Sequence, residues 1–447
     1  MQATLALSGL VVVEIGTSVA GPFAGQILAD LGADVVKVEN PQGGDDARNW
    51  GPPFERGAAP VFNAINRNKR SAAIDLKDEA QRAALRRFIL DEADVVVQNL
   101  RPGLLASYGL DAETLCAAKP SLIYCNLAAY GADGPLKNRP GYDPLMQAFG
   151  GLMSLTGEEG REPVRTGPSI IDQGSAMWAV IGILSALHRR AATGQGCEVA
   201  TSLYETALAW TNMHTASYLA SGRVPRRMGS ENFGICPYKA YQARDGWVVV
   251  AAGNNNLFQR LADALGHPEW VADARFKSNP DRVTNRDALN PLVAAAIATD
   301  TVAAWVETLG RAGVPCAPVL DLEQVMAHPQ FAAVGMLQDG PDGTMPLIGT
   351  PLQFDGERPP FRAHPPALGA DTDAVLGPPP NSGAANSVST SPRLRGEVAR
   401  ASARAGEGGS PRTEHIESPP HPDPLPASGE RERTEFAAPT SNTRRAK

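Results

Sequence analysis

Residues 9–39 read GLVVVEIGTSVAGPFAGQILADLGADVVKVE, and this stretch decides the fold. The run at 10–15 is rich in β-branched residues, which is typical of a buried strand. Residues 20–33 read as a helix, with Pro22 suited to its first turn and Gly32 to its end. The segment DVVKVE at 34–39 is a second strand. A strand, a helix and a second strand in this order predict one unit of a parallel sheet.

Further units of the same kind follow along the chain. We expect strands at 71–77, 94–100 and 121–131, with a helix at 78–93 between the first two. Strands that alternate with helices predict an α/β fold, here a Rossmann-like parallel sheet covered by helices on both faces. This large domain is expected to span 1–212. Residues 345–354, MPLIGTPLQF, read as a strand, so 340–380 is expected to return to the large domain.

Two other regions differ from the large domain in pattern. Residues 225–335 combine a strand at 246–253 with helical spacing at 255–266, 286–300 and 301–313, which predicts a smaller α+β domain. From 381 to 447 Ser, Pro, Gly and Arg dominate and apolar residues are few. Such a composition predicts a disordered, low-complexity tail.

Composition narrows the class of protein. The chain has 447 residues, 43% of them hydrophobic and 20% charged, as in ordinary soluble globular proteins. Its formal net charge of −7 argues against a broad basic face for nucleic acid. The first residues show neither a basic segment nor a signal-peptide cleavage pattern, and their apolar run is too short to span a membrane. We therefore expect a cytoplasmic protein that binds neither nucleic acid nor membrane.

The five cysteines are scattered and show no CxxC or Cys/His spacing. They are Cys116, Cys125, Cys197, Cys236 and Cys316. This pattern predicts free thiols in a reducing compartment and no metal site.

The first strand–helix unit raises the possibility of a dinucleotide site. Its glycines are Gly16, Gly21 and Gly25, and Glu39 ends the second strand. The spacing is not GxGxxG, however, and Pro22 lies where amides should face a pyrophosphate. We interpret these glycines as structural, and an NAD-dependent enzyme remains a minor hypothesis.

Residues 168–190, PSIIDQGSAMWAVIGILSALHRR, place a single carboxylate, Asp172, at the start of an apolar helix. Asp is among the best residues for capping a helix N-terminus, so the local pattern favours a cap. The positive end of the helix also attracts anions, so the alternative is a carboxylate held there to react. Both roles are compatible.

Five segments together resemble class III CoA-transferases of the CaiB/BaiF type. They are AGPFAGQILADLGADVVKVENPQGGD, NRNKRSAAIDLK, VVVQNLRPG, RPGYDPLMQAFGGLMSLTG, and the Asp172 segment with TGQG after it. The resemblance runs from about 8 to 376. The segments GDDARNWGPPF, NRNKRS and AAGNNNLF are most similar to the branch that moves CoA between dicarboxylates such as succinate and glutarate.

The resemblance implies a reaction at Asp172. Its carboxylate would attack an acyl-CoA thioester to give an aspartyl–acyl anhydride, and the CoA thiolate would then give an aspartyl-CoA thioester. An acceptor carboxylate, by analogy a dicarboxylate, would reverse the sequence. Coenzyme A enters as a substrate, and the family implies no permanently bound cofactor.

The resemblance also implies contacts with CoA, an active-site loop and an assembly. Residues implied to contact CoA are Val19, Ile74, Asp75, Lys77, Asn99, Leu100, Arg101, Lys137 and Arg139. Gly229 and Gly234 would lie in a mobile loop over the active site. Family members form interlocked homodimers, so a homodimer is expected.

Several departures and alternatives stay open. Val19 stands where formyl-CoA transferases carry Gln, which argues against oxalate or formate as substrate. The related α-methylacyl-CoA racemases carry a His where this chain has Tyr142, which favours transfer over racemisation. A non-catalytic CoA-binding protein is the alternative of another class. Donor and acceptor remain undefined, although Arg48 and Arg165 are candidates to bind a second carboxylate.

Overall fold

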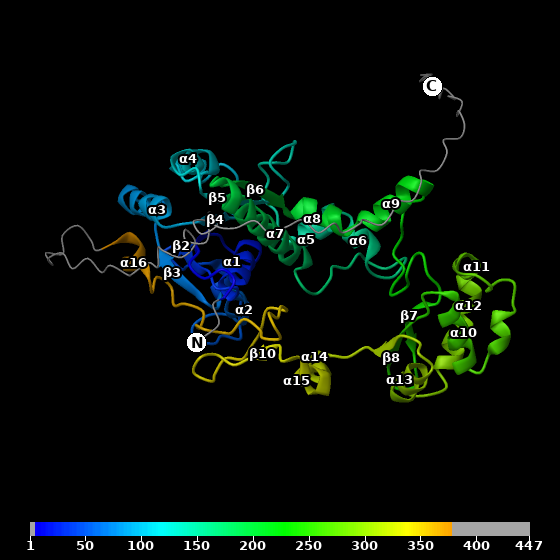
Figure 1. Cartoon of the computed structure of the whole chain (residues 1–447). Helices are drawn as coiled ribbons and strands as arrows, with labels where there is room; N and C mark the ends of the chain where they lie inside the picture. Colours follow the sequence, from blue (N-terminus) through cyan, green and yellow to red (C-terminus); the bar gives the residue numbers. More distant parts are fainter. Residues whose placement is uncertain (1–4, 378–447) are drawn as a thin grey trace, which may run out of the picture. The chain divides into compact units, whose positions relative to one another are not determined.

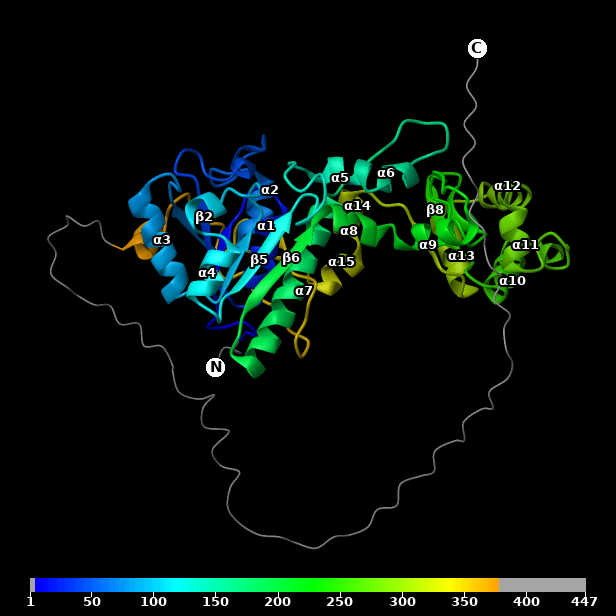
Figure 2. The ribbon, with the colours of Figure 1, turned by 90° about the horizontal axis from the view of Figure 1, so that it is seen from above.

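A computed structural model of the chain describes residues 5–377. Its main feature is a six-stranded parallel sheet in the order β3-β2-β1-β4-β5-β6 (Figures 1 and 2). The strands are β1 (Val11–Ile15), β2 (Asp34–Glu39), β3 (Lys69–Ala73), β4 (Val95–Gln98), β5 (Ile123–Ala128) and β6 (Cys197–Ser202). The predicted Rossmann-like α/β fold is confirmed. The tail predicted at 381–447 lies outside the described residues.

Helices cover both faces of this sheet because alternate side chains of each strand point to opposite faces. Val95 and Val97 pack in one core with α1 (Ala20–Asp30) and α7 (Ile170–Thr193). Val96 packs in a second core with α3 (Glu79–Asp91), α4 (Ala112–Ala118) and α16 (Thr372–Leu376). The shorter helices α2, α5, α6, α8 and α9 span Pro60–Asn66, Asp143–Phe149, Leu152–Leu155, Leu203–Trp210 and Asn212–Ser221.

The residues predicted as a smaller domain have a sheet and a core of their own. The antiparallel sheet has the order β7-β8-β9, with bounds Tyr238–Gln242, Trp247–Ala251 and Cys316–Pro318. Four helices accompany it: α10 (Asn255–Ala264), α11 (Asn279–Thr284), α12 (Arg286–Ile297) and α13 (Val302–Arg311). One hydrophobic cluster gathers buried residues from 236 to 314. The boundaries 225 and 335 stay a prediction.

The segment after α13 carries two short helices, α14 (Leu322–Ala327) and α15 (Pro329–Val334), and a small hairpin. The predicted strand at 345–354 is largely wrong. Only β11 (Leu347–Ile348) is extended in a sheet, and it pairs with β10 (Leu337–Gln338) rather than with the large sheet. Irregular backbone then reaches the large sheet at Ser71, whose O accepts from Asp371 N at 2.8 Å.

α7 is the described helix that is long and apolar enough to cross a membrane by length and composition, and α12 with α13 pass that test only as a pair bent by 111°. The buried side of α7 supplies core residues such as Ile171, Ala179 and Ile183. A core helix passes the same test. The other side of α7 exposes large apolar residues, among them Met177 and Ile181.

Candidate functional site

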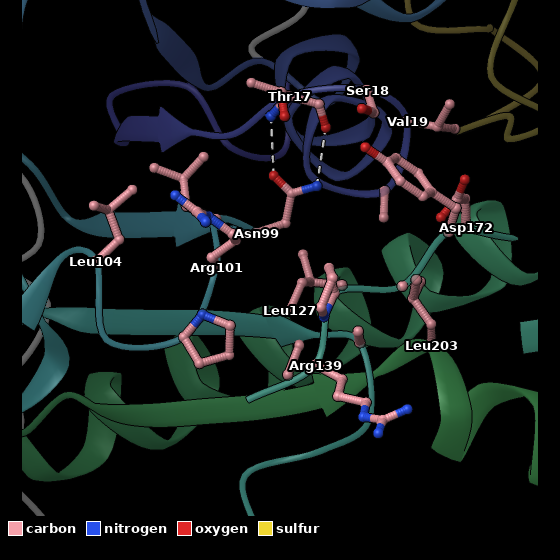
Figure 3. A pocket seen from close by; sticks show the side chains of 18 residues that line it. Thr17, Ser18, Val19, Asn99, Arg101, Leu104, Leu127, Arg139, Asp172 and Leu203 are labelled. Carbon is pink, nitrogen blue, oxygen red and sulfur yellow. Dashed lines mark hydrogen bonds between the residues drawn. The ribbon is translucent and has the colours of Figure 1, made fainter. Parts of the chain in front are cut away.

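A cavity of about 300 Å³ lies at the carboxyl ends of β1 and β4. These strands are neighbours, and the sheet continues from them to β2 on one side and β5 on the other. Open parallel sheets bind ligands at such a switch point. We call it the Asp172 cavity (Figure 3); it is lined by Thr17, Ser18, Val19, Ala20, Asn99, Leu100, Arg101, Pro102, Leu104, Leu127, Ala128, Ala129, Arg139, Pro140, Gly141, Tyr142, Asp172 and Leu203.

The turn after β1 forms one wall of the cavity, and Asn99 holds it from the end of β4. Thr17 N donates to Asn99 Oδ1 at 3.0 Å, and Asn99 Nδ2 donates to Thr17 O at 2.9 Å (Figure 3). A Cβ on Gly16 or Gly21 would lie 2.6 or 2.9 Å from Asn99 Oδ1. Both positions therefore require glycine so that the amide fits between them, which explains the glycine spacing without a dinucleotide.

The same turn contains a strained residue. Ser18 has φ +68°, in the left-handed region that non-glycine residues seldom adopt. Such a conformation costs about 1–3 kcal/mol and persists only where neighbours enforce it. Ser18 N donates to the buried carboxylate of Asp45 at 2.9 Å. The turn thus lines the cavity and is held by Asp45, which does not line it.

Asp172 lies in the first turn of α7, but it is not the helix cap. The N-cap residue is Ser169, and two backbone N–H groups of the first turn donate to Asp143. Asp143 Oδ2 accepts from Ile171 N at 2.7 Å and from Asp172 N at 3.2 Å. Gln147 Nε2 donates to the other oxygen of Asp143 at 2.6 Å. The carboxylate of Asp172 is left for the cavity, so the capping interpretation is wrong.

The surroundings of Asp172 favour its neutral form. Burial raises the pKa of Asp172, and the nearby Asp143 carboxylate raises it further, from 3.8 to about 7. The positive ends of α1 and α7 act in the opposite direction, because both helices begin at this cavity. With a pKa of about 7, both the ionised and the neutral form of Asp172 are populated near neutral pH.

A second cavity, of about 220 Å³, adjoins the first and shares Thr17, Leu100 and Leu104 with it. We call it the Lys77 cavity. Ile74, Asp75 and Lys77 line it, as does Tyr108. Asp75 Oδ1 accepts from Lys77 N at 2.9 Å, which shapes the loop after β3. Four residues with predicted CoA contacts, Leu100 among them, thus lie together here.

The remaining cations with predicted CoA contacts border the cavities from the other side. Arg139 lines the Asp172 cavity, and Arg101 lines both this cavity and a third one of about 640 Å³. Lys137 lines only that third cavity, which also contains Glu198. Figure 3 shows Asp172 and Leu104 at opposite ends of the Asp172 cavity, with Asn99 and Arg101 between them. Arg139 thus lines the same cavity as Asp172, whereas Lys137 does not.

Gly229 and Gly234 line none of these three cavities within the described residues. Gly229 N donates to Gly157 O at 2.8 Å, in the loop that leads to α7. Gly234 N donates to Asn232 Oδ1 at 2.9 Å. The prediction that this segment covers the active site stays a prediction.

The two arginines considered for a second carboxylate lie elsewhere. Arg48 donates two hydrogen bonds to Glu39, at 2.8 and 2.7 Å, and a third to Pro366 O. Arg165 is exposed and donates to Thr166 O and Gly167 O beside its own position. Neither residue lines the Asp172 cavity as the structure describes it.

Sequence reasoning missed Asp143 and Asp45. Asp143 is the first residue of α5 and precedes a proline, which signals only the start of a helix. Nothing local relates it to Asp172, 29 residues away. Among residues 5–377 no group of three His, Cys, Asp or Glu side chains could hold a metal ion.

Comparison with known proteins agrees with this geometry. The family model of CoA-transferase family III matches residues 7–372. A succinate–glutarate CoA-transferase of Agrobacterium fabrum is 35% identical over 83% of this chain and 96% of that protein. An acetyl-CoA:oxalate CoA-transferase of Acetobacter aceti is 36% identical over 78% of this chain and 89% of that protein.

A solved structure shows the same fold. The crystal structure of a CaiB/BaiF family protein from Brucella suis is 40% identical, covers 83% of this chain and 98% of that chain, and has a TM-score of 0.74. With the family match over nearly the whole described chain, the class is established. This chain belongs to CoA-transferase family III and is an enzyme that transfers CoA.

Proposed function

We propose that this enzyme moves CoA from succinyl-CoA, or a similar acyl-CoA, to a dicarboxylic acid through covalent intermediates on Asp172. The observation that carries the proposal is the position of Asp172. Its carboxylate lines one end of a cavity that continues, past Leu100 and Leu104, into the Lys77 cavity. An elongated substrate with phosphates at one end and a thioester at the other matches such a path.

The reaction needs no external base. The ionised Asp172 oxygen attacks the thioester carbon, the C–S bond breaks, and CoA leaves as a thiolate, which gives an aspartyl–acyl anhydride. The thiolate attacks the aspartyl carbon and releases the donor acid. The acceptor carboxylate then attacks the resulting aspartyl-CoA thioester, and the returning thiolate releases the new acyl-CoA and Asp172. Each step exchanges one leaving anion for another.

The structure of the site suits these steps. A partly desolvated carboxylate with a raised pKa is a better nucleophile than one in bulk water. The N-terminal ends of α1 and α7 both border the cavity, and helix N-termini stabilise negative charge. Charge that develops on the attacked carbonyl oxygen would therefore meet two positive helix ends.

We propose that CoA places its nucleotide in the Lys77 cavity and its pantetheine arm along Leu100 and Leu104. Lys77, Asp75 and Ile74 line this cavity, and Arg101 lines the adjoining Asp172 cavity. Arg139 lines the Asp172 cavity, where a cation suits either a phosphate or the second carboxylate of the acceptor. The names of the relatives include both glutarate and oxalate, so an acceptor screen is needed to choose.

Racemisation requires a second acid or base beside the α-carbon. The position implied for it is Tyr142, which is 61% exposed and lines the cavity. None of the histidines in residues 5–377 lines the Asp172 cavity. Transfer therefore remains the better account.

We also propose that a second copy of the chain covers the outer face of α7, in a cytoplasmic homodimer. Large apolar side chains are exposed along α7, among them Met177 (50%), Trp178 (41%) and Ile181 (50%). Exposed apolar residues continue on α8 and α9, with Trp210 and Leu219. Contiguous exposure of this kind marks an interface. In such a dimer a partner's segment around Gly229 and Gly234 would be available to close the site against water.

The dimer is tested by light scattering after size-exclusion chromatography. Ile181→Lys should give monomers, whereas Leu322→Lys, at a residue 81% exposed on α14, should leave the dimer intact. A monomeric wild type, or co-sedimentation of the wild type with phospholipid vesicles, would contradict this part of the proposal.

The function is tested by a screen of acyl-CoA donors against carboxylic acids, read by mass spectrometry of the CoA thioesters formed. We expect the wild type to convert succinyl-CoA and a dicarboxylate, with glutarate the first acceptor to try, and Asp172→Ala to convert nothing. Equal turnover by Asp172→Ala, or α-proton exchange of 2-methylacyl-CoA in deuterated water without CoA transfer, would overturn it.

A further inference from the structure

A group of buried charges lies directly behind the wall of the Asp172 cavity. We call it the turn cluster; it consists of Glu14, Lys37, Asp45 and Lys69. The side chains of Glu14, Lys37 and Lys69 are 0% exposed and Asp45 is 1% exposed. None of the four lines the cavity within the described chain. Any effect they have on the reaction therefore acts through the residues in front of them.

The cluster is internally neutral and closely paired. Glu14 on β1 lies beside Lys37 on β2 in the register of the parallel pair, with Oε1 2.8 Å from Lys37 Nζ. Its other oxygen is 2.7 Å from Lys69 Nζ on β3, and Asp45 Oδ2 is 2.9 Å from Lys37 Nζ. Burial alone would lower the pKa of Lys37, but the surrounding carboxylates outweigh it and raise that pKa. Burial lowers the pKa of Lys69 to about 8, so near neutral pH both lysines are largely protonated and face the two carboxylates.

Each of three members also holds one point of the turn between β1 and α1. Lys37 Nζ donates to Gly16 O at 2.9 Å. Asp45 Oδ1 accepts from Ser18 N at 2.9 Å, and Lys69 Nζ donates to Pro22 O at 2.6 Å. The three contacts follow one another along the chain, from the end of β1 to the first turn of α1. None of the three side chains lines the Asp172 cavity.

The turn itself lines the cavity of the reacting residue. Thr17, Ser18 and Val19 line the cavity with Asp172, and Val19 is the N-cap of α1. Ser18 has the left-handed backbone conformation that only external contacts maintain. A turn with this conformation would relax to another shape if its contacts with Lys37, Asp45 and Lys69 were lost.

Stability alone is a poor explanation for the cluster. The attraction between buried charges offsets the free-energy cost of removing them from water only in part. Apolar residues of similar size often stabilise the fold as well or better. What apolar residues do not supply is a directed bond to a carbonyl or an amide at a chosen point of the backbone. The turn cluster supplies three of these within seven residues, 16–22, at the wall of the active site.

We propose that Asp45, Lys37, Glu14 and Lys69 are positioning residues for CoA transfer: they hold the Gly16–Pro22 turn in its strained shape so that its cavity side fits the acyl group bound at Asp172. The inference rests on the proposed reaction at Asp172. It assigns a role in turnover to buried side chains that touch neither CoA nor the acyl group.

The test compares two buried carboxylates at opposite ends of α1. Asp45→Ala removes the anchor of Ser18, and Asp45→Asn keeps an oxygen acceptor but removes the charge beside Lys37. Asp30→Asn is the matched control, because Asp30 is also 1% exposed and paired with a buried cation, Arg67, at 2.6 Å. For each variant we would measure Tm, together with kcat and KM for transfer from succinyl-CoA to glutarate.

We expect Asp45→Ala to lower kcat by roughly 30- to 100-fold, since small misplacements of a reacting geometry cost about this much. KM for succinyl-CoA should change less than about threefold, and Asp45→Asn should fall between wild type and Asp45→Ala. Asp30→Asn should lower Tm with kcat of the folded enzyme within about twofold.

A double variant separates positioning from general damage. If Asp45 is needed because Ser18 is strained, Ser18→Gly should recover about tenfold of the kcat lost in Asp45→Ala, because glycine adopts the left-handed region without strain. Should Asp45→Ala not fold, Asp45→Asn with and without Ser18→Gly makes the same comparison.

The outcomes are distinguishable from those of the proposed function. A wild type that transfers no CoA between these acids, or an Asp172→Ala variant that does, contradicts the function itself. A functional wild type whose Asp45 variants lose no more kcat than Asp30→Asn, or gain nothing from Ser18→Gly, shows that the turn cluster only stabilises the fold.

Discussion

The two ends of α1 are both held by buried charges, yet they serve different purposes. At the N-terminal end, Lys37, Asp45 and Lys69 hold a strained turn whose other side lines the Asp172 cavity. At the C-terminal end, Asp30 pairs with Arg67, and Arg67 donates to Ile348 O in the hairpin strand β11 at 2.7 Å. The first set contacts backbone at the wall of the Asp172 cavity, and the second connects a distant segment of the chain to the large domain. Burial of a charge alone therefore does not identify its role; the backbone that it contacts does.

The largest effect is expected where the N-terminal end meets the reacting residue. Asp172→Asn keeps the size of the side chain but removes the nucleophile, so turnover should fall at least about 1,000-fold. Because burial raises the pKa of Asp172 to about 7, its ionised form destabilises the fold at pH 8, and the neutral amide should therefore also raise Tm at that pH. Steady-state assays and thermal melts check both. Turnover within tenfold of wild type would show that the residue opposite the turn is not the nucleophile.

The C-terminal end should respond in stability instead of in turnover. Arg67→Met leaves Asp30 buried without its main cation, which should lower the free energy of unfolding by about 3–5 kcal/mol. The control is Arg70→Met, whose ion pair with Asp34 is exposed and should be worth less than about 1 kcal/mol. Urea unfolding measures both. If kcat of folded Arg67→Met fell as far as kcat of Asp45→Ala, the two ends of α1 would not differ in their effect on turnover.

The reactive end should also give the enzyme its pH dependence. Burial, and then the Asp143 carboxylate, raise the pKa of Asp172 to about 7. Only the ionised form attacks, so kcat should fall about tenfold per pH unit as pH drops below this value. In stability the sign is opposite: a raised pKa contributes most below about pH 4, and this contribution is lost as pH rises through 7. Single-turnover rates and Tm from pH 5 to 9 test the pair of trends; parallel trends would contradict it.

The smallest effect is expected at Asp143. Its carboxylate accepts from backbone N–H groups at the start of α7, as Asp45 accepts from Ser18 N before α1. Asp143→Asn keeps an oxygen for Ile171 N but removes the charge that raises the pKa of Asp172. The acid limb of the rate profile should move down by up to about one pH unit. An unmoved limb, in a variant with unchanged Tm, would mean that burial alone sets the pKa.

Much of the fold follows from local patterns. The strands predicted at 10–15 and 34–39 are confirmed to within one residue, because runs of apolar β-branched residues are typical of buried strands. The helix predicted at 20–33 is confirmed but ends at Asp30. The strand predicted at 71–77 instead begins at Lys69. A lysine in a buried strand contradicts the usual pattern, and its ion-pair partner, Glu14, lies on another strand.

For the site, too, local sequence patterns predict only some of the residues. The family motifs indicate Asp172, and the structure places it in the cavity. Asp143 and Asp45 act on backbone groups 28 and 27 residues away, and no local spacing relates such partners. Gly25 gives a partial signal: its missing Cβ leaves room for Glu14 Oε2 and Lys69 Nζ. A glycine inside a helix thus marks the buried cluster, although the sequence does not say what fills the space.

Mass analysis of a trapped intermediate tests the central statement most directly. The wild type, incubated with succinyl-CoA, quenched and digested, should yield the peptide that contains Asp172 with the added mass of CoA. Hydroxylamine before digestion should convert that adduct to the hydroxamate at the same residue. A peptide that never carries extra mass while the protein turns over, or an adduct on another residue, would contradict the account.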